Sequence, residues 1–310
     1  MAERDFGTDE VFQRIAELKA ERGALILAHY YQRLEIQLHA DIVGDSFELS
    51  RKALECPEQL IVFCGVRFMA ESAKLLSPGK KILLPNSAAG CPMADMADAD
   101  TIRACRAKYP DAAVVCYVNS SAEAKAECDV CCTSSNAVKI VKSLPQRQII
   151  FVPDRNLGAY VAARLPDKEF IFIEGFCPIH NAVTPEQVAR ARELHPGAKV
   201  AAHPECVPAV TQLSDFVGST SQIIAFCERS DAAEFIVATE QGVVERLVHF
   251  NPRKRFCLLS SGLVCPNMKK TSPGDILRAL QDDRYQTELP PELIERAAAP
   301  LRRMVQIAAM

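Results

Sequence analysis

The stretch ALILAH (24–29), followed by ADIVG (40–44), LIVFCG (60–65) and KILLPN (81–86), decides the fold class of this chain. Each run is short and mostly apolar, and segments with a helix-like pattern lie between some of the runs. Continuous apolar strands that alternate with helices are typical of a parallel sheet buried on both faces. The first third of the chain is therefore predicted to be a small parallel α/β unit.

The same pattern recurs twice further along the chain. Polar and apolar positions of the three thirds align at shifts of 88 and then 86 residues. The aligned sets are His29, Tyr117 and His203; Tyr31, Asn119 and Glu205; Asp41, Asp129 and Asp215; Ser46, Ser134 and Thr220; and Ile61, Ile149 and Phe235. Self-similarity at a fixed period indicates an internal repeat. We therefore expect an α/β protein of three homologous small parallel-sheet domains, arranged with pseudo-threefold symmetry around a central active site.

The expected domain boundaries follow from this repeat. The three α/β repeats are predicted at residues 1–95, 96–182 and 183–270, and C-terminal helices at 271–310. Helices are expected near residues 8–21, 98–108, 184–195 and 273–282, and a last helix over 290–308 is expected to be broken at Pro300. The chain has no linker of the Gly/Ser type, so the domains are expected to pack tightly.

Each repeat contains one Cys-Pro dipeptide in nearly the same register, at Cys91, Cys177 and Cys265, whereas Cys56-Pro57 lies outside the register. A closed zinc site usually takes four ligands, often from paired CxxC motifs. A four-iron cluster held by three thiolates instead leaves one iron open to act as a Lewis acid, which suits dehydration chemistry. Three buried structural cysteines are the alternative interpretation.

The polar aligned positions come directly after predicted strands. In parallel α/β units, ligands bind beyond the carboxyl ends of the strands, so these side chains are expected to face one cavity. Ser46, Ser134 and Thr220 are expected to open helices, whose N-termini attract carboxylates and phosphates; ordinary helix caps are the alternative. His180, three residues after Cys177, is a further candidate.

Composition limits the classes of protein that remain. The net charge of −3 with mixed signs argues against a nucleic-acid surface. No apolar run approaches the ~20 residues that a membrane span needs, and the acidic, polar start MAERDFGTDE does not resemble a signal peptide. Thirteen cysteines, an odd number, lie mostly in apolar runs, which indicates a reducing compartment and a cytoplasmic protein. The run of Cys128, Cys131 and Cys132 could be a redox pair or half of a zinc site, but packing is the favoured interpretation.

Longer strings of the chain resemble the quinolinate synthase family. Among them are AHYYQ (28–32), ADIVGDSFELS (40–50), CDVCCTSSNA (128–137), EGFCPIH (174–180) and VCPNMK (264–269). They occur in family order from about residue 25 to 270. The resemblance implies a transferase of NAD biosynthesis that condenses iminoaspartate with dihydroxyacetone phosphate to quinolinate, with loss of phosphate and two waters. It also implies a 4Fe-4S cluster and three homologous domains around a central site.

Residue by residue, the resemblance implies the same positions that the repeat selects. The cluster ligands would be Cys91, Cys177 and Cys265. The substrate-binding residues would be His29, Ser46, Tyr117, Asn119, Ser134, His203, Glu205 and Thr220. Tyr31 matches a tyrosine implicated in catalysis. We expect Tyr31 and Glu205 to carry the proton transfers, with His29 and His203 stabilising or relaying charge.

Some expectations concern partners and alternatives. Some family members carry a CxxCxxC motif before the last Cys-Pro, but Leu259 and Gly262 occupy those positions here, so no regulatory disulfide is expected there. A transient contact with the enzyme that supplies iminoaspartate is a further expectation. Another iron–sulfur hydro-lyase is the alternative enzyme. An iron or redox sensor using Cys128 and Cys131 is the non-enzymatic alternative, but the sequence offers no segment for a nucleic-acid or protein partner.

Overall fold

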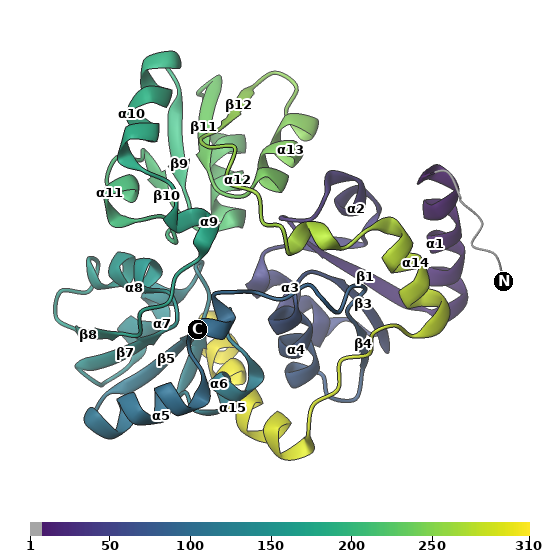
Figure 1. Cartoon of the computed structure of the whole chain (residues 1–310), viewed down its shortest axis with the longest axis horizontal. Helices are drawn as coiled ribbons and strands as arrows, with labels where there is room; N and C mark the ends of the chain where they lie inside the picture. The colour runs from purple at the N-terminus through teal and green to yellow at the C-terminus, as the bar shows by residue number, and fades with distance from the viewer. Residues whose placement is uncertain (1–7) are drawn as a thin grey trace.

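Three four-stranded sheets, each entirely parallel, form the frame of the computed structural model, which describes residues 8–310. The strand order is β2-β1-β3-β4 in the first sheet, β6-β5-β7-β8 in the second and β10-β9-β11-β12 in the third, which is one topology used three times. In Figure 1 the sheets and their helices form three lobes around a common centre. The predicted fold class is confirmed. Residues 1–7 lie outside the described range. They open the expected first repeat, and the signal-peptide expectation partly rests on them.

The first lobe shows why its strands are continuously apolar. Along β1 and β3, Ile26 and Val62 belong to the buried cluster on one face of the sheet, and Leu27 and Phe63 belong to the cluster on the other face. Both faces are buried, as the sequence pattern requires. The elements are α1 (Thr8–Arg22), β1 (Ala24–His29), α2 (Leu34–His39), β2 (Ile42–Gly44), α3 (Ser46–Glu55), β3 (Leu60–Cys64), α4 (Arg67–Leu76), β4 (Lys81–Leu83) and η1 (Ala94–Met96).

The second and third lobes repeat this order of elements. The second contains α5 (Ala99–Lys108), β5 (Ala113–Tyr117), α6 (Ala122–Ala126), β6 (Val130–Cys132), α7 (Ala137–Ser143), β7 (Gln148–Val152), α8 (Arg155–Ala162), β8 (Glu169–Phe172) and α9 (Pro178–Asn181). The third contains α10 (Pro185–Leu194), β9 (Lys199–Ala202), α11 (Pro208–Thr211), β10 (Phe216–Val217), α12 (Thr220–Arg229), β11 (Glu234–Ala238), α13 (Gln241–Phe250), β12 (Arg255–Leu258) and η2 (Met268–Lys270).

The aligned aspartates have one structural role in all three lobes. Each carboxylate lies just before the second strand of its sheet and accepts a backbone N–H from the first strand. The pairs are Asp41 with Ile26 at 2.8 Å, Asp129 with Val114 at 2.7 Å and Asp215 with Val200 at 2.8 Å. This bond fixes the return of the chain beside the first strand, so the aspartates belong to the frame.

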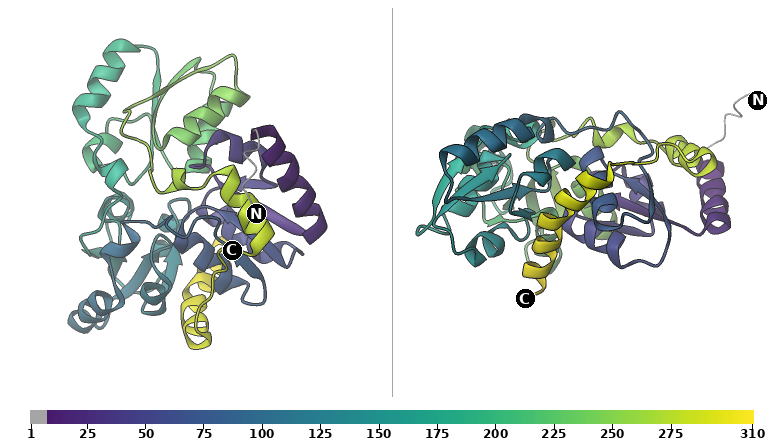
Figure 2. Two further views of the ribbon diagram at one scale, coloured as in Figure 1. Left: turned by 45° about the vertical axis from the view of Figure 1, so that its right-hand side comes forward. Right: turned by 90° about the horizontal axis from the view of Figure 1, so that it is seen from below.

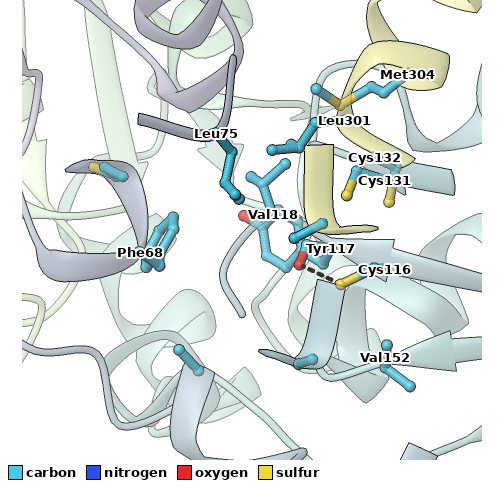
Figure 3. Close-up of a cluster of buried hydrophobic side chains, with 14 of the residues drawn as sticks. Phe68, Leu75, Cys116, Tyr117, Val118, Cys131, Cys132, Val152, Leu301 and Met304 are labelled. Carbon is cyan, nitrogen blue, oxygen red and sulfur yellow. Dashed lines mark hydrogen bonds between the residues drawn. The ribbon is translucent and has the colours of Figure 1, made fainter. Parts of the chain in front are cut away.

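Two C-terminal helices pack on the lobes. Helix α14 (Pro273–Asp282) lies against α1, and α15 (Pro291–Ala309) lies against α4 of the first lobe and α6 and β6 of the second, as Figures 1 and 2 show. Leu301 and Met304 of α15 join the buried cluster around Tyr117 and Val118 (Figure 3). None of the helices in the described range combines the length and the apolar character needed to cross a membrane.

The predicted break at Pro300 is wrong. Helix α15 continues through Pro300, which is itself buried. Proline removes one backbone hydrogen bond and crowds the preceding turn. Here the flanking residues Ala297, Ala298 and Leu301 are fully buried against the first two lobes, and this burial outweighs the local cost, as tertiary packing commonly does.

Candidate active site

One cavity of about 180 Å³ lies where the three lobes meet. Its walls contain residues from the carboxyl ends of strands in every lobe, where parallel α/β units bind ligands. Twelve of the predicted site residues line it: His29, Tyr31, Ser46, Cys91, Tyr117, Asn119, Ser134, Cys177, His203, Glu205, Thr220 and Cys265. His180 does not line it but lies fully buried directly behind Cys177, with its Nδ1 atom 3.2 Å from the cysteine Sγ.

The three Cys-Pro cysteines come from equivalent loops, one in each lobe, and all are free thiols. No other cysteine of residues 8–310 lines the cavity, and Cys56 instead ends helix α3. Burial raises the pKa of Cys91 to about 12, with a further contribution from the Cys265 thiol, and raises the pKa of Cys177 well above its ordinary value. Three thiols that resist ionisation in a buried cavity suit a cationic centre that stabilises their thiolates.

His29 and His203 occupy the same place in their lobes and make the same local bond. The Nδ1 atom of His29 accepts the Tyr31 N–H at 3.1 Å, and that of His203 accepts the Glu205 N–H at 3.3 Å. Each bond fixes the ring at the end of its strand, with Nδ1 as the acceptor. Burial lowers the pKa of His29 to about 3 and that of His203 to about 4, so both imidazoles are neutral at pH 7.

Glu205 is the centre of a buried hydrogen-bond network. Its Oε1 atom accepts the Tyr117 hydroxyl at 2.7 Å, and its Oε2 atom lies 2.7 Å from His180 Nδ1. Burial by itself would raise the pKa of this carboxyl, but His203, His180 and the bond from Tyr117 together lower it to about 2. Glu205 is therefore an ionised base inside the cavity.

The Tyr31 hydroxyl lies between two threonines of the third lobe. It is 2.9 Å from Thr239 Oγ1 and accepts a hydrogen bond from Thr220 Oγ1 at 3.2 Å. Thr239 also lies 3.1 Å from His180 Nε2. Burial, with the nearby Glu205 charge, raises the pKa of Tyr31 well above its ordinary value. Tyr31 is therefore a protonated donor, opposite in character to Glu205.

The aligned hydroxyls are not helix caps. Asp45 caps α3 and Ser219 caps α12, each one residue before the predicted side chain. Ser46 and Thr220 are thus the first helical residues, and their hydroxyls are not needed as caps. Ser134 differs from the prediction, because it lies in the turn before α7 and does not open that helix. The capping interpretation is therefore wrong for all three residues.

The polar surface of the cavity lacks fixed cations. Among the described residues that line it, none is lysine or arginine. Anionic groups would instead meet the N-termini of α3 and α12, whose orphan N–H groups and dipoles favour negative charge. The buried Oδ1 atom of Asn119 has no hydrogen-bond partner among residues 8–310. An unpaired buried acceptor is costly, so it calls for a ligand N–H or O–H.

Thr239 is a residue of the site that the sequence did not predict. Its equivalents in the first two repeats are Gly65 and Pro153, so comparison of the repeats finds no shared polar position. Its only sequence signal is its place directly after the apolar strand β11.

Comparisons with known proteins agree on one family. Residues 13–306 match the family described as quinolinate synthetase A protein. The chain is 52% identical to the quinolinate synthase of Caldicellulosiruptor bescii over 94% of this chain and 97% of that protein. It is 49% identical to that of Caldicellulosiruptor saccharolyticus over 97% and 99%. It is 47% identical to that of Aquifex aeolicus over 96% and 94%.

Proposed function

The chain belongs to the quinolinate synthase family, and from this premise we propose that its cavity joins iminoaspartate and dihydroxyacetone phosphate to form quinolinate. The reaction releases one phosphate and two waters for each quinolinate and serves NAD biosynthesis. The observation that carries the proposal is the convergence of three thiols, a base and an acid on one cavity.

The donor set of the cavity fits a 4Fe-4S cluster. Cys91, Cys177 and Cys265 supply one thiol from each lobe, and three thiolates leave one iron without a protein ligand. When bound, the cluster would supply a Lewis acid that assists the loss of hydroxyl groups. A single metal ion on Cys177, His180 and Glu205, whose donor atoms lie within 4.8 Å of one another, is the competing arrangement. It leaves two thiols of the cavity unexplained, so we favour the cluster.

The substrates carry two carboxylates and a phosphate, and the cavity binds such groups without lysine or arginine. We assign their recognition to the N-termini of α3 and α12 with the hydroxyls of Ser46 and Thr220, and to Ser134 in the turn before α7. The unpaired Asn119 oxygen accepts a substrate N–H or O–H. Neutral His29 and His203 add hydrogen bonds without adding charge.

Ring formation requires protons to leave carbon and nitrogen and to reach departing hydroxyl groups. Glu205, ionised at neutral pH, accepts protons, and Tyr31, protonated at neutral pH, donates them. A pair of groups whose pKa values are pushed apart is the arrangement that acid–base catalysis uses. Thr220 and Thr239 hold the Tyr31 hydroxyl in place.

The setting of the enzyme follows from its chemistry. Imines hydrolyse in water, so we propose that iminoaspartate arrives through transient contact with the enzyme that makes it. Thirteen free cysteines and an iron–sulfur site support a reducing, cytoplasmic setting.

Anaerobic reconstitution tests the cofactor and the reaction together. The protein is purified without oxygen and supplied with iron and sulfide, and the bound metals are then analysed. We expect about four irons and four sulfides per chain, and quinolinate from iminoaspartate and dihydroxyacetone phosphate. Zinc in place of iron would favour the single-ion site. Turnover of simple hydroxy acids without quinolinate would favour another hydro-lyase.

Serine variants give the matched control. Replacing Cys91, Cys177 or Cys265 by serine should remove the cluster absorbance and the activity, whereas Cys56→Ser, at the fourth Cys-Pro, should keep both. Full cluster content in any of the first three variants would contradict the ligand assignment.

A further inference from the structure

Two buried carboxylates hold the backbone of two of the three cluster cysteines. Asp154 and Glu240 are fully buried and are the N-caps of helices α8 and α13. The Oδ2 atom of Asp154 accepts the Cys177 N–H at 3.0 Å. The Oε1 atom of Glu240 accepts the Cys265 N–H at 3.1 Å. The two residues are 86 positions apart in the sequence, which is the shift that relates the second and third repeats.

The other oxygen of each carboxylate accepts a backbone N–H from the helix that the residue caps. Asp154 Oδ1 accepts the Leu157 N–H at 2.7 Å, and Glu240 Oε2 accepts the Gly242 N–H at 2.7 Å. Both oxygens are therefore acceptors, which only a carboxyl group provides among side chains of this size. Lys269 also contacts Glu240, at 3.0 Å, and donates to the Tyr31 backbone oxygen at 2.8 Å.

Within the described part of the first lobe, no carboxylate holds the cysteine loop in this way. The equivalent residue is Val66, the N-cap of α4, which makes no side-chain capping bond. All three lobes share another backbone hydrogen bond. Its donor is the N–H of the first helical residue, directly after the N-cap, and its acceptor is the carbonyl two residues before the cysteine. These bonds are Arg67 to Ala89, Arg155 to Gly175 and Gln241 to Leu263, each at 2.8 Å. The Cys91 loop thus has the shared bond without the carboxylate.

We propose that Asp154 and Glu240 are positioning residues that hold Cys177 and Cys265 in place for the cluster, and that Cys91 is the least restrained of the three ligands. The inference rests on the proposed cofactor. Two ligand loops are preorganised by the fold, and the third closes on the cluster last and opens first. Supporting groups of this kind commonly control how well a metal site holds its metal.

Hydrogen exchange of the full chain tests the carboxylates locally. It is measured by mass spectrometry on peptides around Cys91, Cys177 and Cys265, before and after anaerobic cluster loading. In the unmodified protein the Cys91 amide should exchange faster than the other two. Asp154→Asn should speed exchange at Cys177 alone by about tenfold, and Glu240→Gln should do so at Cys265 alone, because an amide side chain has one acceptor oxygen in place of two.

Asp98→Asn is the matched control, because Asp98 is an exposed helix cap whose carboxylate accepts the Thr101 N–H and not the N–H of a cysteine. It should leave all three cysteine peptides unchanged. Equal acceleration of the three loops in Asp154→Asn, or none at Cys177, would overturn the proposal. Equal exchange of the three cysteine amides in the unmodified protein would also overturn it, and this comparison needs no variant to fold.

Iron release gives the second readout. On loaded protein, Asp154→Asn and Glu240→Gln should lose iron to a chelator several-fold faster than the unmodified protein and Asp98→Asn. Unchanged release despite faster exchange would overturn the role in holding the cluster. If no cluster forms in any protein, the proposed cofactor fails, whereas exchange before loading still tests the carboxylate bonds.

Discussion

The Tyr31 hydroxyl shows how one atom joins two lobes at the site. The residue comes from the loop after β1, yet both of its hydroxyl partners, Thr220 and Thr239, come from the third lobe. Its position therefore depends on closure of the third lobe on the first. The contact that positions the Tyr31 hydroxyl therefore forms only when the first and third lobes pack together.

Tyr31→Phe removes that hydroxyl and keeps the ring. We expect the rate of quinolinate formation to fall by about 10²–10⁴-fold, the usual contribution of a general acid or base, with cluster content unchanged. Steady-state kinetics on protein of measured iron content checks this. Tyr160→Phe is the control. The Tyr160 hydroxyl donates a hydrogen bond of 3.2 Å to the Val217 carbonyl oxygen, and Tyr160 does not line the cavity. Full turnover by Tyr31→Phe would remove Tyr31 from the mechanism.

His29 and His203 make stability depend on pH. Their folded-state pKa values, about 3 and about 4, lie below the ordinary value of about 6.5. The stability that they contribute as neutral groups is present above pH 6.5 and is lost as pH falls toward the folded values. Each should add a slope of ~1.4 kcal/mol per pH unit between about pH 6 and pH 4. Urea unfolding of the cluster-free protein at several pH values checks this.

Replacement of either histidine by asparagine should flatten that slope, whereas His249→Asn, at an exposed position, should not. A stability that does not change between pH 4 and 6 would contradict the lowered pKa values.

Much of the candidate site could be predicted because the three internal repeats can be aligned with one another. His29 and His203 are aligned positions of the repeat, and they make the same bond and line the same cavity. Their roles in the reaction stay predictions. Thr239 and Glu240 were missed because their aligned positions are not polar in all three repeats. Thr239 aligns with Gly65 and Pro153, and the position of Glu240 is Val66 in the first repeat. Sequence comparison within the chain finds what the repeats share and misses what makes them differ.

At the scale of elements, the N-terminus of α13 fits closely against the first lobe. A Cβ atom built on Gly242 would lie 2.6 Å from the Tyr30 oxygen and 2.8 Å from the Gln32 oxygen. These backbone atoms flank Tyr31 and have little room to move. Glycine is therefore required here by contact between two lobes.

Gly242→Ala should push α13 away from the loop that carries Tyr31. We expect a loss of about 1–3 kcal/mol in the free energy of unfolding, typical of overpacking, and a larger relative loss of turnover, because the threonines no longer reach Tyr31. Gly274→Ala is the control, since its added Cβ comes no closer than 3.4 Å, to the Arg278 side chain. Equal kinetics for the two variants would contradict this account.

Elements also show where sequence patterns fail. The apolar runs predicted every sheet, because burial on both faces leaves a continuous signal. The break at Pro300 was wrong because a local rule was applied where packing of Ala297, Ala298 and Leu301 decides. Ser46 opens α3 as expected, but the alternative interpretation that it caps this helix is wrong, since the neighbouring Asp45 is the cap.

At the scale of the whole molecule, α15 joins the first two lobes into one core. Leu301 is fully buried in a cluster that contains residues of β3, α4, β5 and β6. The third lobe adds Met268 to this cluster, but most of its buried apolar residues form two other clusters. The first two lobes are thus expected to behave as one rigid unit and the third as a separate one.

Leu301→Ala should cost about 2–5 kcal/mol, as buried leucine truncations do, and the first two lobes should still unfold in one transition. Arg302→Ala, at the neighbouring exposed position, should change stability by less than about 0.5 kcal/mol. Thermal and urea unfolding check both. Separate transitions for the first and second lobes would show that α15 does not join them.

The position of α15 also sets a schedule for biosynthesis. A ribosome releases the first two lobes early, but α15, which completes their common core, is made only after the third lobe. At ~5–20 residues per second, the interval between residue 182 and the C-terminus is on the order of ten seconds. In the first part of this interval Cys265 has not yet been made, and the core that α15 shares with the first two lobes is incomplete until α15 emerges. The proposed cluster would therefore be assembled on a chain that has been synthesised at least as far as α15, after its three lobes can pack together.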